Sequence, residues 1–192
     1  MSDSLNAGYF EGIFQSDDDP WGLASSAYED AKFARTIAVL DDRRYAHALE
    51  VGCAHGVLTA RLAPLCDALL AVDISAAAIA KARKRLADIP HVALEKMAFP
   101  REAPTSADVD LIVLSEVVYY WSDADIALAA SRIDEMLARN GRIILVHWTG
   151  DTDYPQTGDA AVAKLWSALA NACSIEIAER TDDYRLDLWT RR

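Results

Sequence analysis

The amino-acid sequence predicts an α/β protein with a Rossmann-like, doubly wound and mostly parallel sheet that has helices on both faces. From residue 46 onward, short apolar runs typical of strands alternate with amphipathic segments typical of helices. A glycine-containing turn follows the first apolar run, at the position where open α/β sheets bind their ligands. Two strand-like segments close the chain with a short polar turn between them. The alternation implies parallel strands covered by helices, and the closing pair implies an antiparallel edge.

The N-terminal part of the chain is predicted to be helical. Residues 5–15 form a short amphipathic helix, which ends where acidic turn formers and a proline occupy residues 16–20. A second helix begins at Ser26, because apolar residues recur at helical spacing from there to Leu40. This part therefore precedes the predicted sheet.

The rest of the chain is predicted to alternate strands and helices. Strands are expected at residues 46–51, 68–72, 92–94, 109–114, 142–147, 174–178 and 184–189, and helices at 57–65, 75–87, 123–138 and 159–170. Ser75 is placed to cap the second of these helices, and Asn140-Gly141 is expected to stop the third. Residues 99–107 contain two prolines and little periodicity, which indicates a loop in place of a full helix.

Size and charge restrict the kind of protein and partner. A chain of 192 residues has the usual length of one domain. Its formal net charge of −11 would repel a phosphate backbone, so a nucleic-acid substrate is disfavoured. The charge would suit a cationic or neutral small molecule, although an acidic surface also serves solubility alone.

Cysteine, histidine and apolar patterns indicate a cytoplasmic protein without a metal. The three cysteines form no C-x-x-C pair, and the N-terminus lacks the features of a signal peptide. No apolar run approaches the roughly 18 residues that span a bilayer, so no membrane association is expected. His47, His55 and His91 show no metal-ligand spacing, and His55 is expected to face solvent.

The turn after the first strand differs from a dinucleotide fingerprint. A G-x-G-x-x-G/A motif starting at Gly52 would have Gly at position 54 and Gly or Ala at position 57, but the sequence has Ala54 and Val57. Gly52 and Gly56 still allow the backbone to pass close to a ligand, without the spacing specific for pyrophosphate. The ligand therefore need not contain phosphate, and the alternative is a plain strand-to-helix turn.

Two carboxylates near this turn favour a nucleoside that carries an amine. Asp73 lies 21 residues after Gly52 at the end of the second strand, where a carboxylate can accept both hydroxyl protons of a ribose. Glu50 lies at the carboxyl end of the first strand, next to its last residue, where it could hold an ammonium group or orient the loop. A ribose and an amine without phosphate describe S-adenosylmethionine, whose product after methyl transfer is S-adenosylhomocysteine.

Four segments resemble the successive motifs of class I S-adenosylmethionine-dependent methyltransferases. They are Leu49-Glu50-Val51-Gly52-x-x-x-Gly56, Ala71-Val72-Asp73-Ile74-Ser75, the segment from Asp110 to Glu116, and the segment from Asn140 to Leu145. The resemblance implies a seven-stranded sheet of order 3-2-1-4-5-7-6 with strand 7 antiparallel. It also implies a single domain over residues 1–192, in which residues 1–44 form a helical cap over the cofactor and residues 45–192 form the α/β core.

A narrower resemblance is to the nodulation-protein-S group, whose members methylate an amine on a saccharide and whose relatives act on sugars in natural-product pathways. It rests on Asp19-Pro20-Trp21, Tyr28-Glu29-x-x-Lys32 and the segment from Ser115 to Tyr120. The resemblance places Trp21 and Lys32 at the methionine end of the cofactor. The residues alone are also consistent with a buried anchor at Trp21 and a solvated helix residue at Lys32.

The resemblance completes the expected cofactor site. Met97 and Ala98 are implied as contacts to adenine, although Met97 also fits a core position. The full set of predicted cofactor residues is Trp21, Lys32, Glu50, Gly52, Cys53, Ala54, Gly56, Asp73, Ile74, Met97, Ala98 and Ser115.

Candidate residues for the acceptor follow the fourth and fifth strands. Glu116 and Tyr120 follow the fourth strand, where a carboxylate and aromatic faces could hold an amine, a hydroxyl or a sugar ring. His147 ends the fifth strand and could be the general base that an O-methyl transfer requires. Alternatively, the aromatic residues pack inward and His147 is structural. The predicted activity is thus methyl transfer to an oxygen or nitrogen of a small acceptor, a sugar or an amine.

Two other functions remain open on the sequence alone. An NAD-dependent oxidoreductase has the same broad architecture, but Ala54 and Val57 count against it. A non-catalytic binding domain would keep the fold without the reaction, since a fold does not determine a function.

Overall fold

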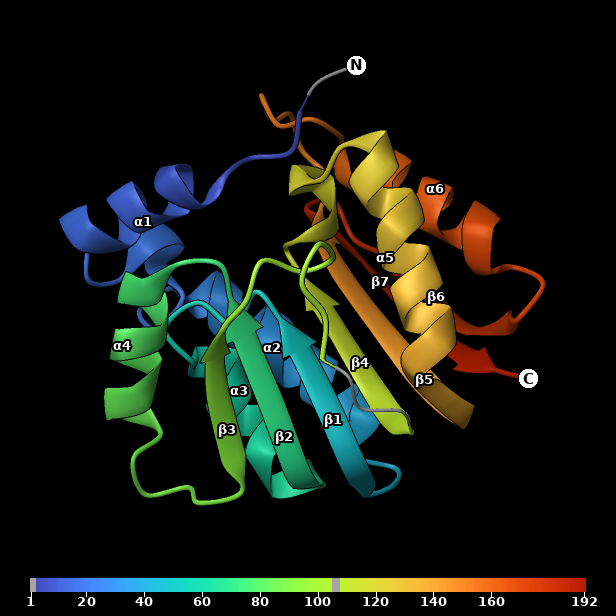
Figure 1. The fold of residues 1–192 in the computed structure, drawn as a ribbon, viewed down its shortest axis with the longest axis horizontal. Coiled ribbons are helices and arrows are strands. Elements are labelled where there is room, and N and C mark those ends of the chain that lie inside the picture. Colours follow the sequence, from blue (N-terminus) through green and yellow to red (C-terminus); the bar gives the residue numbers. More distant parts are fainter. Residues whose placement is uncertain (1–2, 105–107) are drawn as a thin grey trace. The chain divides into compact units, whose positions relative to one another are not determined.

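The computed structural model describes residues 3–104 and 108–192 of the chain. In this described part the sheet has seven strands in the order β3-β2-β1-β4-β5-β7-β6, which confirms the predicted order (Figure 1). The strands are β1 (Tyr45–Val51), β2 (Cys66–Asp73), β3 (Val92–Lys96), β4 (Val109–Ser115), β5 (Leu137–Trp148), β6 (Cys173–Arg180) and β7 (Tyr184–Arg191). Neighbouring strands β1 and β2, β2 and β3, and β4 and β5 pair in parallel, whereas β7 pairs antiparallel with both β5 and β6.

The described residues fall into two compact units, and residues 6–97 form the first of them. Its helices are α1 (Ala7–Ser16), α2 (Ala27–Leu40), α3 (Val57–Leu62) and α4 (Ala76–Arg85), with 3-10 turns η1 (Pro20–Gly22) and η2 (Ala63–Leu65). In Figure 1, α2 and α3 lie behind the three parallel strands of this unit, and α1 lies beside α4.

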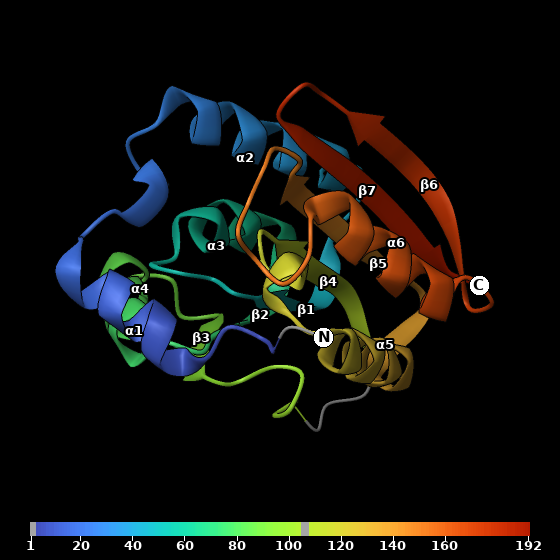
Figure 2. The same ribbon diagram turned by 90° about the horizontal axis from the view of Figure 1, so that it is seen from above.

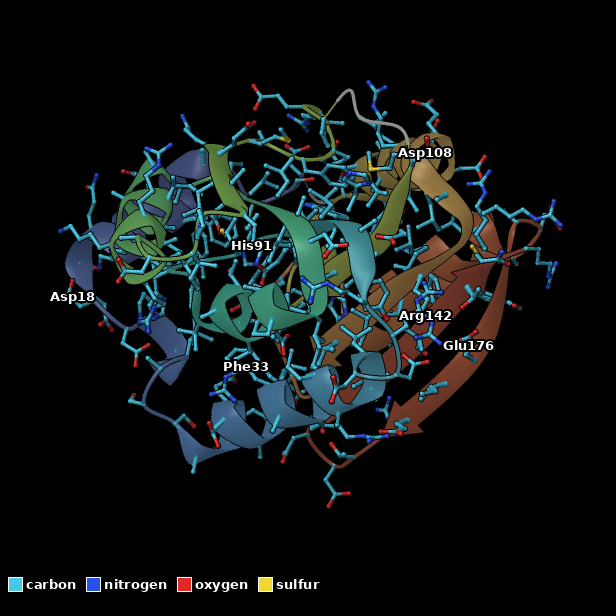
Figure 3. All side chains as sticks on the ribbon, turned by 90° about the horizontal axis from the view of Figure 1, so that it is seen from below. Asp18, Phe33, His91, Asp108, Arg142 and Glu176 are labelled. Atoms are coloured by element: carbon cyan, nitrogen blue, oxygen red, sulfur yellow. The ribbon has the colours of Figure 1, made fainter. Side chains whose placement is uncertain are left out.

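Hydroxyl caps and apolar faces explain why these helices form where they do. Ser26 and Ser75 precede α2 and α4, and each side chain accepts a hydrogen bond from a backbone N–H of the first turn. The predicted cap at Ser75 is therefore confirmed. Phe33 is buried on the inner face of α2, where the Arg61 guanidinium lies 5.5 Å from its ring centre (Figure 3).

The second unit contains the remaining described residues, 3–5, 98–104 and 108–192. Its helices are α5 (Asp123–Met136) and α6 (Gly158–Leu169), and a 3-10 turn, η3 (Val118–Tyr120), follows β4. Figure 2 shows α5 and α6 side by side on one side of β5 and β7. Residues 99–104 are turns and irregular chain, as predicted, and residues 105–107 of the expected loop lie outside the described residues.

The prediction that Asn140-Gly141 ends α5 is wrong. The helix ends at Met136 because Leu137 already has extended backbone angles, and β5 begins there. Asn140 has a φ of 58°, and a side chain at Gly141 would lie 2.7 Å from the Ala138 carbonyl oxygen. These two residues therefore form an irregularity near the start of β5, where its register with β4 shifts.

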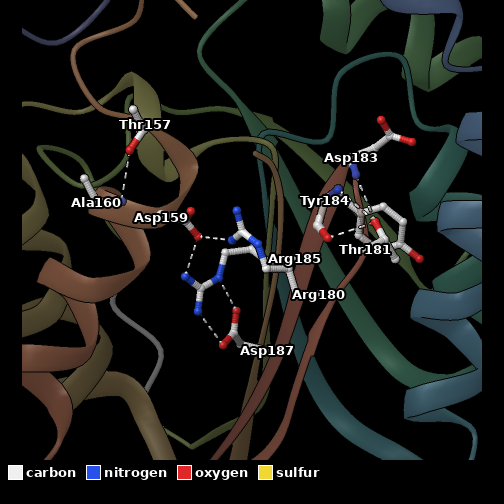
Figure 4. Close-up of polar contacts among 9 residues, drawn as sticks. All are labelled: Thr157, Asp159, Ala160, Arg180, Thr181, Asp183, Tyr184, Arg185 and Asp187. Atoms are coloured by element: carbon white, nitrogen blue, oxygen red, sulfur yellow. Dashed lines mark hydrogen bonds and ion pairs between the residues drawn. The ribbon is translucent and has the colours of Figure 1, made fainter. Parts of the chain in front are cut away.

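Ion pairs join the start of α6 to the closing hairpin (Figure 4). The Asp159 carboxylate accepts hydrogen bonds from Arg180 and Arg185, and Arg185 also donates two hydrogen bonds to Asp187. Asp187 is buried, so this bidentate pairing compensates the cost of burying its charge. The Thr181 hydroxyl accepts the N–H groups of two residues that follow it and so fixes the hairpin turn.

A further ion pair joins β5 to the closing hairpin. The Arg142 side chain of β5 lies 3.2 Å from the Glu176 carboxylate of β6, and both residues are labelled in Figure 3.

Within the described residues, no helix is both long enough and apolar enough to cross a membrane. Nor do those residues contain a group of three or more His, Cys, Asp or Glu side chains arranged to hold a metal ion.

Candidate functional site

The loop between β1 and α3 has three residues in the left-handed region, with φ values of 77° at Gly52, 51° at Ala54 and 82° at Gly56. The N–H groups of Gly52 and Cys53 both donate to the carbonyl oxygen of Val72, at 2.8 and 3.0 Å. These bonds hold the loop against the end of β2. The loop is thus a tight, fixed turn whose backbone a ligand can approach closely.

Gly56 is required by space as well as by its backbone angle. A Cβ atom at this position would lie 3.0 Å from Leu86 and 3.3 Å from Ala82 of α4. The absence of a side chain therefore lets the start of α3 approach α4.

Asp73 fixes the loop to the second strand. Its two carboxylate oxygens accept the N–H groups of Ala54 at 2.9 Å and Ser75 at 2.8 Å. Burial raises the pKa of Asp73 to about 6, although these hydrogen bonds oppose the shift. Each carboxylate oxygen has a second lone pair, so the geometry is compatible with the predicted ribose contact.

Glu50 is the penultimate residue of β1, and its carboxyl group is buried. Burial raises its pKa to about 7, the nearby Thr59 hydroxyl opposes this shift, and the charge of Asp73 adds to it. Among the described residues, the Glu50 Oε2 atom has no hydrogen-bond partner. A buried acceptor without a donor is costly, so this atom is suited to a ligand that brings an N–H group or a positive charge.

Trp21 lies in η1 with an unusual backbone and an exposed ring. Its φ is 60°, its side chain is 45% exposed, and its ring meets Phe14 edge-on at 5.7 Å. The interpretation of Trp21 as a buried anchor is therefore wrong. An exposed aromatic ring on left-handed backbone is a strained arrangement of the kind that occurs at ligand sites.

His55 is buried, which corrects the expectation that it faces solvent. Phe14 of α1 covers its ring at 6.4 Å, and Asp19 lies 3.2 Å from its Nε2 atom. Burial lowers the pKa of His55 and favours the neutral imidazole. The sequence did not reveal this because the covering residues come from the preceding N-terminal segment.

Lys32 is buried in α2, so its interpretation as a solvated helix residue is also wrong. Its ammonium lies 2.9 Å from a carboxylate oxygen of Glu29 and 5.1 Å from the ring centre of Tyr28. The motif Tyr28-Glu29-x-x-Lys32 thus forms one cluster on a single helix face. Its predicted contact with the cofactor remains a prediction.

The N-terminal helix is fastened beside this loop, a feature that sequence patterns did not reveal. The Glu11 carboxylate accepts the Ser75 hydroxyl at 2.8 Å and the N–H of Ala77 at 3.1 Å. These hydrogen bonds lower the pKa of Glu11 and keep it charged at the N-terminus of α4. Lys81 of α4 donates to the carbonyl oxygen of Asp17.

The remaining predicted cofactor residues differ in how deeply they are buried and in which unit they belong to. Cys53 is buried against Ala71 and Ile79, and burial raises the pKa of its thiol. The Met97 N–H donates to the Asp73 carbonyl oxygen at 2.9 Å, which places Met97 next to the proposed ribose site. Ile74 is half-buried. Ala98 and Ser115, also half-buried, belong to the second unit.

In the second unit, Glu116 follows β4 with a φ of 54°. Its Oε2 atom accepts the Tyr119 hydroxyl at 2.7 Å and the N–H of Trp148 at 2.9 Å. Its own N–H donates to the Val146 carbonyl oxygen. The residue is half-buried, and its carboxylate is held by donors from η3 and β5.

Three tyrosines form a cluster beside Glu116, and one of them, Tyr119, donates its hydroxyl to this carboxylate. The rings of Tyr119 and Tyr120 meet edge-on at 4.5 Å, and Tyr154 stacks on Tyr119 at 5.2 Å. Burial raises the pKa of Tyr119 and Tyr120, so both hydroxyls stay protonated at neutral pH. Tyr154 was not among the predicted site residues, although it is the sole aromatic residue of the polar loop after β5.

His147 is fully buried beneath this cluster. Its Nε2 atom accepts the N–H of Val118 at 3.1 Å, and its ring meets Tyr119 edge-on at 5.4 Å. The neutral imidazole therefore carries its proton on Nδ1, and its Nε2 lone pair holds η3 in place. This arrangement favours the structural alternative for His147.

The sequence matches the protein-family model described as Nodulation protein S over residues 14–181. The chain belongs to the nodulation protein S family. This confirms the predicted group, and the sheet order is that of class I S-adenosylmethionine-dependent methyltransferases. The match includes the Trp21 turn, the buried Lys32 cluster and the Glu116 cluster.

Relatives and solved structures agree with this family. Nodulation protein S of Bradyrhizobium diazoefficiens is 36% identical over 165 residues, which is 85% of this chain and 78% of that protein. A putative methyltransferase structure from Pseudomonas syringae is 35% identical, with a TM-score of 0.76, and the match covers 86% of this chain and 100% of that one. The N-methyltransferase NodS of Bradyrhizobium japonicum, solved with S-adenosylhomocysteine, has a TM-score of 0.83 at 22% identity and covers 97% and 99% of the two chains.

Proposed function

We propose that this member of the nodulation protein S family transfers the methyl group of S-adenosylmethionine to the nitrogen of a small amine, an amino sugar or a conjugate of one. The observation that supports a nitrogen acceptor is the Glu116 carboxylate, which is fixed among tyrosines after β4. The N-methyltransferase activity of the Bradyrhizobium japonicum relative supports the same choice.

The first unit has groups that fit the cofactor. The unpaired Oε2 atom of Glu50 would accept a hydrogen bond from the amino group in the methionine part of the cofactor, and Asp73 would accept hydrogen bonds from the ribose hydroxyls. The backbone of the Gly52–Gly56 loop would lie close to the cofactor. S-adenosylmethionine supplies an electrophilic methyl group on a sulfonium when it is bound. The predicted contacts of Trp21 and Lys32, and those of Met97, Ala98 and Ser115, are part of this proposal.

An amine reacts through its lone pair, so the protein must bind the amine and allow it to lose a proton. The Glu116 carboxylate is suited to both tasks, because it can hold an ammonium group and accept its proton. The Tyr119 hydroxyl already donates to Glu116, so Tyr119 holds this carboxylate in place, and the half-buried ring of Tyr120 can face a sugar or a cation. Holding the amine in line with the methyl group lowers the barrier by positioning.

The geometry of His147 is a second reason for preferring nitrogen to oxygen. A hydroxyl acceptor usually needs a general base, but the Nε2 lone pair of His147 already accepts the N–H of Val118. We therefore assign His147 a positioning role: it holds the turn that bears Tyr119 and Tyr120. Glu116 is the residue that would contact the acceptor.

The test measures methyl transfer from S-adenosylmethionine to a glucosamine dimer, with a glucose dimer of the same linkage as the control. We expect one N-methyl group on the amino sugar and none on the control. Glu116→Gln should lower kcat/KM about a hundredfold. His147→Gln keeps an acceptor atom for Val118 and should keep most of the turnover with an unchanged pH profile.

Contrary results would select the alternatives. Methylation of the glucose dimer at a similar rate, abolished in His147→Gln, would establish an O-methyltransferase with His147 as its base. Tighter binding of NAD than of S-adenosylhomocysteine would favour the oxidoreductase. Binding of S-adenosylhomocysteine without transfer to any amine or sugar would favour a non-catalytic domain.

The proposed setting of this reaction is the cytoplasm. All three cysteines are free and buried, which fits a reducing compartment. The net charge of −11 makes a nucleic acid an unsuitable acceptor and leaves a small cationic or neutral molecule as the partner that fits best.

A further inference from the structure

The loop of residues 149–157, between β5 and α6, brings one aromatic ring to the Glu116 cluster. Tyr154 stacks on Tyr119 with an interplanar angle of 20° and meets Tyr120 edge-on at 4.7 Å. The three rings thus contact each other, and one of them bears the hydroxyl that donates to Glu116. The sequence placed candidate acceptor residues after the fourth and fifth strands, but none of the predicted ones lies in this loop.

Gln156 anchors this loop with an unusually complete set of hydrogen bonds. Its backbone N–H donates to the Tyr119 carbonyl oxygen at 3.1 Å. Its side-chain NH₂ group donates to the Trp121 carbonyl oxygen at 3.4 Å and to the Asp123 carboxylate at 2.8 Å. Its side-chain oxygen accepts the ammonium of Lys164 at 2.8 Å. Both polar atoms of this buried side chain are therefore paired.

These bonds fix the loop to the turn that bears the acceptor residues. Polar connections of this length are commonly mobile on a protein surface. Here Gln156, two residues after Tyr154, contacts the carbonyl oxygens of both Tyr119 and Trp121. The hydrogen bonds of Gln156 therefore hold the chain next to Tyr154 in place, in addition to the packing of the Tyr154 ring itself.

We propose that Tyr154 is an acceptor-binding residue that forms the third aromatic wall beside Glu116, and that Gln156 is the residue that positions it. This inference rests on the proposed function and names further residues of the same site. A tyrosine ring here offers a face to a sugar ring or to an ammonium group next to the Glu116 carboxylate. Tyr154 would therefore contribute to selecting an amino sugar over a neutral sugar.

Calorimetric titration of the S-adenosylhomocysteine-loaded protein with the glucosamine dimer tests the role of Tyr154. Tyr154→Ala should weaken binding of the dimer about tenfold, whereas Tyr154→Phe, which keeps the ring, should restore most of the affinity. The affinity for S-adenosylhomocysteine should not change in either variant. Ile175→Ala, which removes an exposed side chain of β6, is the control and should bind the dimer like the wild type.

The positioning role of Gln156 has its own test. Gln156→Leu removes the side-chain hydrogen bonds of this anchor at similar size, keeps the backbone bond to Tyr119, and should weaken binding of the dimer by a similar factor. Because Gln156 acts through Tyr154, the double variant Tyr154→Ala/Gln156→Leu should bind no more weakly than Tyr154→Ala alone. Additive losses would contradict the positioning role.

The outcomes distinguish this inference from the proposed function. Equal binding of the dimer by Tyr154→Ala and the wild type would overturn the inference, and so would failure of the wild type to bind the dimer. Weakened binding in Tyr154→Ala, together with no methyl transfer by the wild type, would support the Tyr154 wall and reject the proposed N-methyl transfer.

Discussion

At the residue scale, the main result is that several ionisable groups near the loop after β1 and on α2 are buried. Glu50, Asp73, Lys32 and His55 all have low exposure, and two of them were expected to face solvent or were consistent with doing so. Sequence patterns identify the residue types at the ends of strands, but they do not show which side chains a distant segment covers. His55 is covered by residues of α1 and of the turn after it, which no local pattern could reveal.

Glu50→Gln should stabilise the ligand-free protein and weaken its binding of S-adenosylhomocysteine. The folded-state pKa of Glu50, about 7, lies above its ordinary value of 4.5, so its contribution to stability is full below about pH 4.5 and is lost as the pH rises through 7. At pH 8 the substitution removes a buried charge and should raise the free energy of unfolding by on the order of 2 kcal/mol. Denaturant unfolding at pH 5 and pH 8 measures this difference.

Ligand binding should show the opposite pH trend. The wild type should bind S-adenosylhomocysteine more weakly as the pH falls below 7, because a protonated Glu50 no longer attracts an ammonium group. Glu50→Gln should bind at least about tenfold more weakly at pH 8 and lose the dependence near pH 7, which leaves only the dependence from Asp73, whose pKa is about 6. Glu135→Gln, an exposed carboxylate of α5, is the control. An unchanged affinity in Glu50→Gln would remove Glu50 from the cofactor site.

At the element scale, the ends of helices and turns were predictable where neighbouring residues determine them. They were not predictable where a contact with a distant strand determines them. The cap at Ser75 and the hairpin turn at Thr181 depend on nearby side-chain hydrogen bonds, and both were placed correctly. The end of α5 was misplaced, because Leu137 leaves the helix to pair with Val109 of β4 before the chain reaches Asn140. A partner distant in sequence therefore overrode the local stop signal.

Gly56→Ala tests the turn that begins α3. Alanine is unfavourable at a φ of 82°, and its Cβ would approach Leu86 to 3.0 Å, so the free energy of unfolding should fall by about 2 kcal/mol. Binding of S-adenosylhomocysteine should weaken as well. Gly12→Ala is the matched control, since a Cβ there meets no atom within 4 Å in the middle of α1, and it should be neutral or slightly stabilising. Equal thermal melting points for the two variants would contradict this role of Gly56.

At the scale of the whole molecule, the order of the sheet was predictable because motifs and hairpin together restrict the topology. The resemblance of four motifs gave the order of the strands, and the short turn between the last two required an antiparallel edge. The acceptor site was only partly predictable. Glu116 and Tyr120 were found from their place after β4, but Tyr154 depends on how a loop folds back onto that turn.

We propose that residues 1–192 unfold as a single domain, although the described residues fall into two compact units. The seven strands form one sheet, and a break in a sheet exposes unpaired backbone groups. Calorimetry should show one transition with equal calorimetric and van't Hoff enthalpies, and S-adenosylhomocysteine should shift it without splitting it. Two separable transitions, of which the ligand moves one, would reject the single domain.

Because all three native thiols are buried, a cysteine introduced on the surface of the folded protein can be labelled selectively. Cys53, Cys66 and Cys173 are all inaccessible, and burial raises the pKa of the Cys53 and Cys173 thiols, which keeps them in the unreactive protonated form. A single cysteine introduced at an exposed position would react first with a maleimide dye. The native cysteines could then stay in place while fluorescence reports on the acceptor loop during turnover.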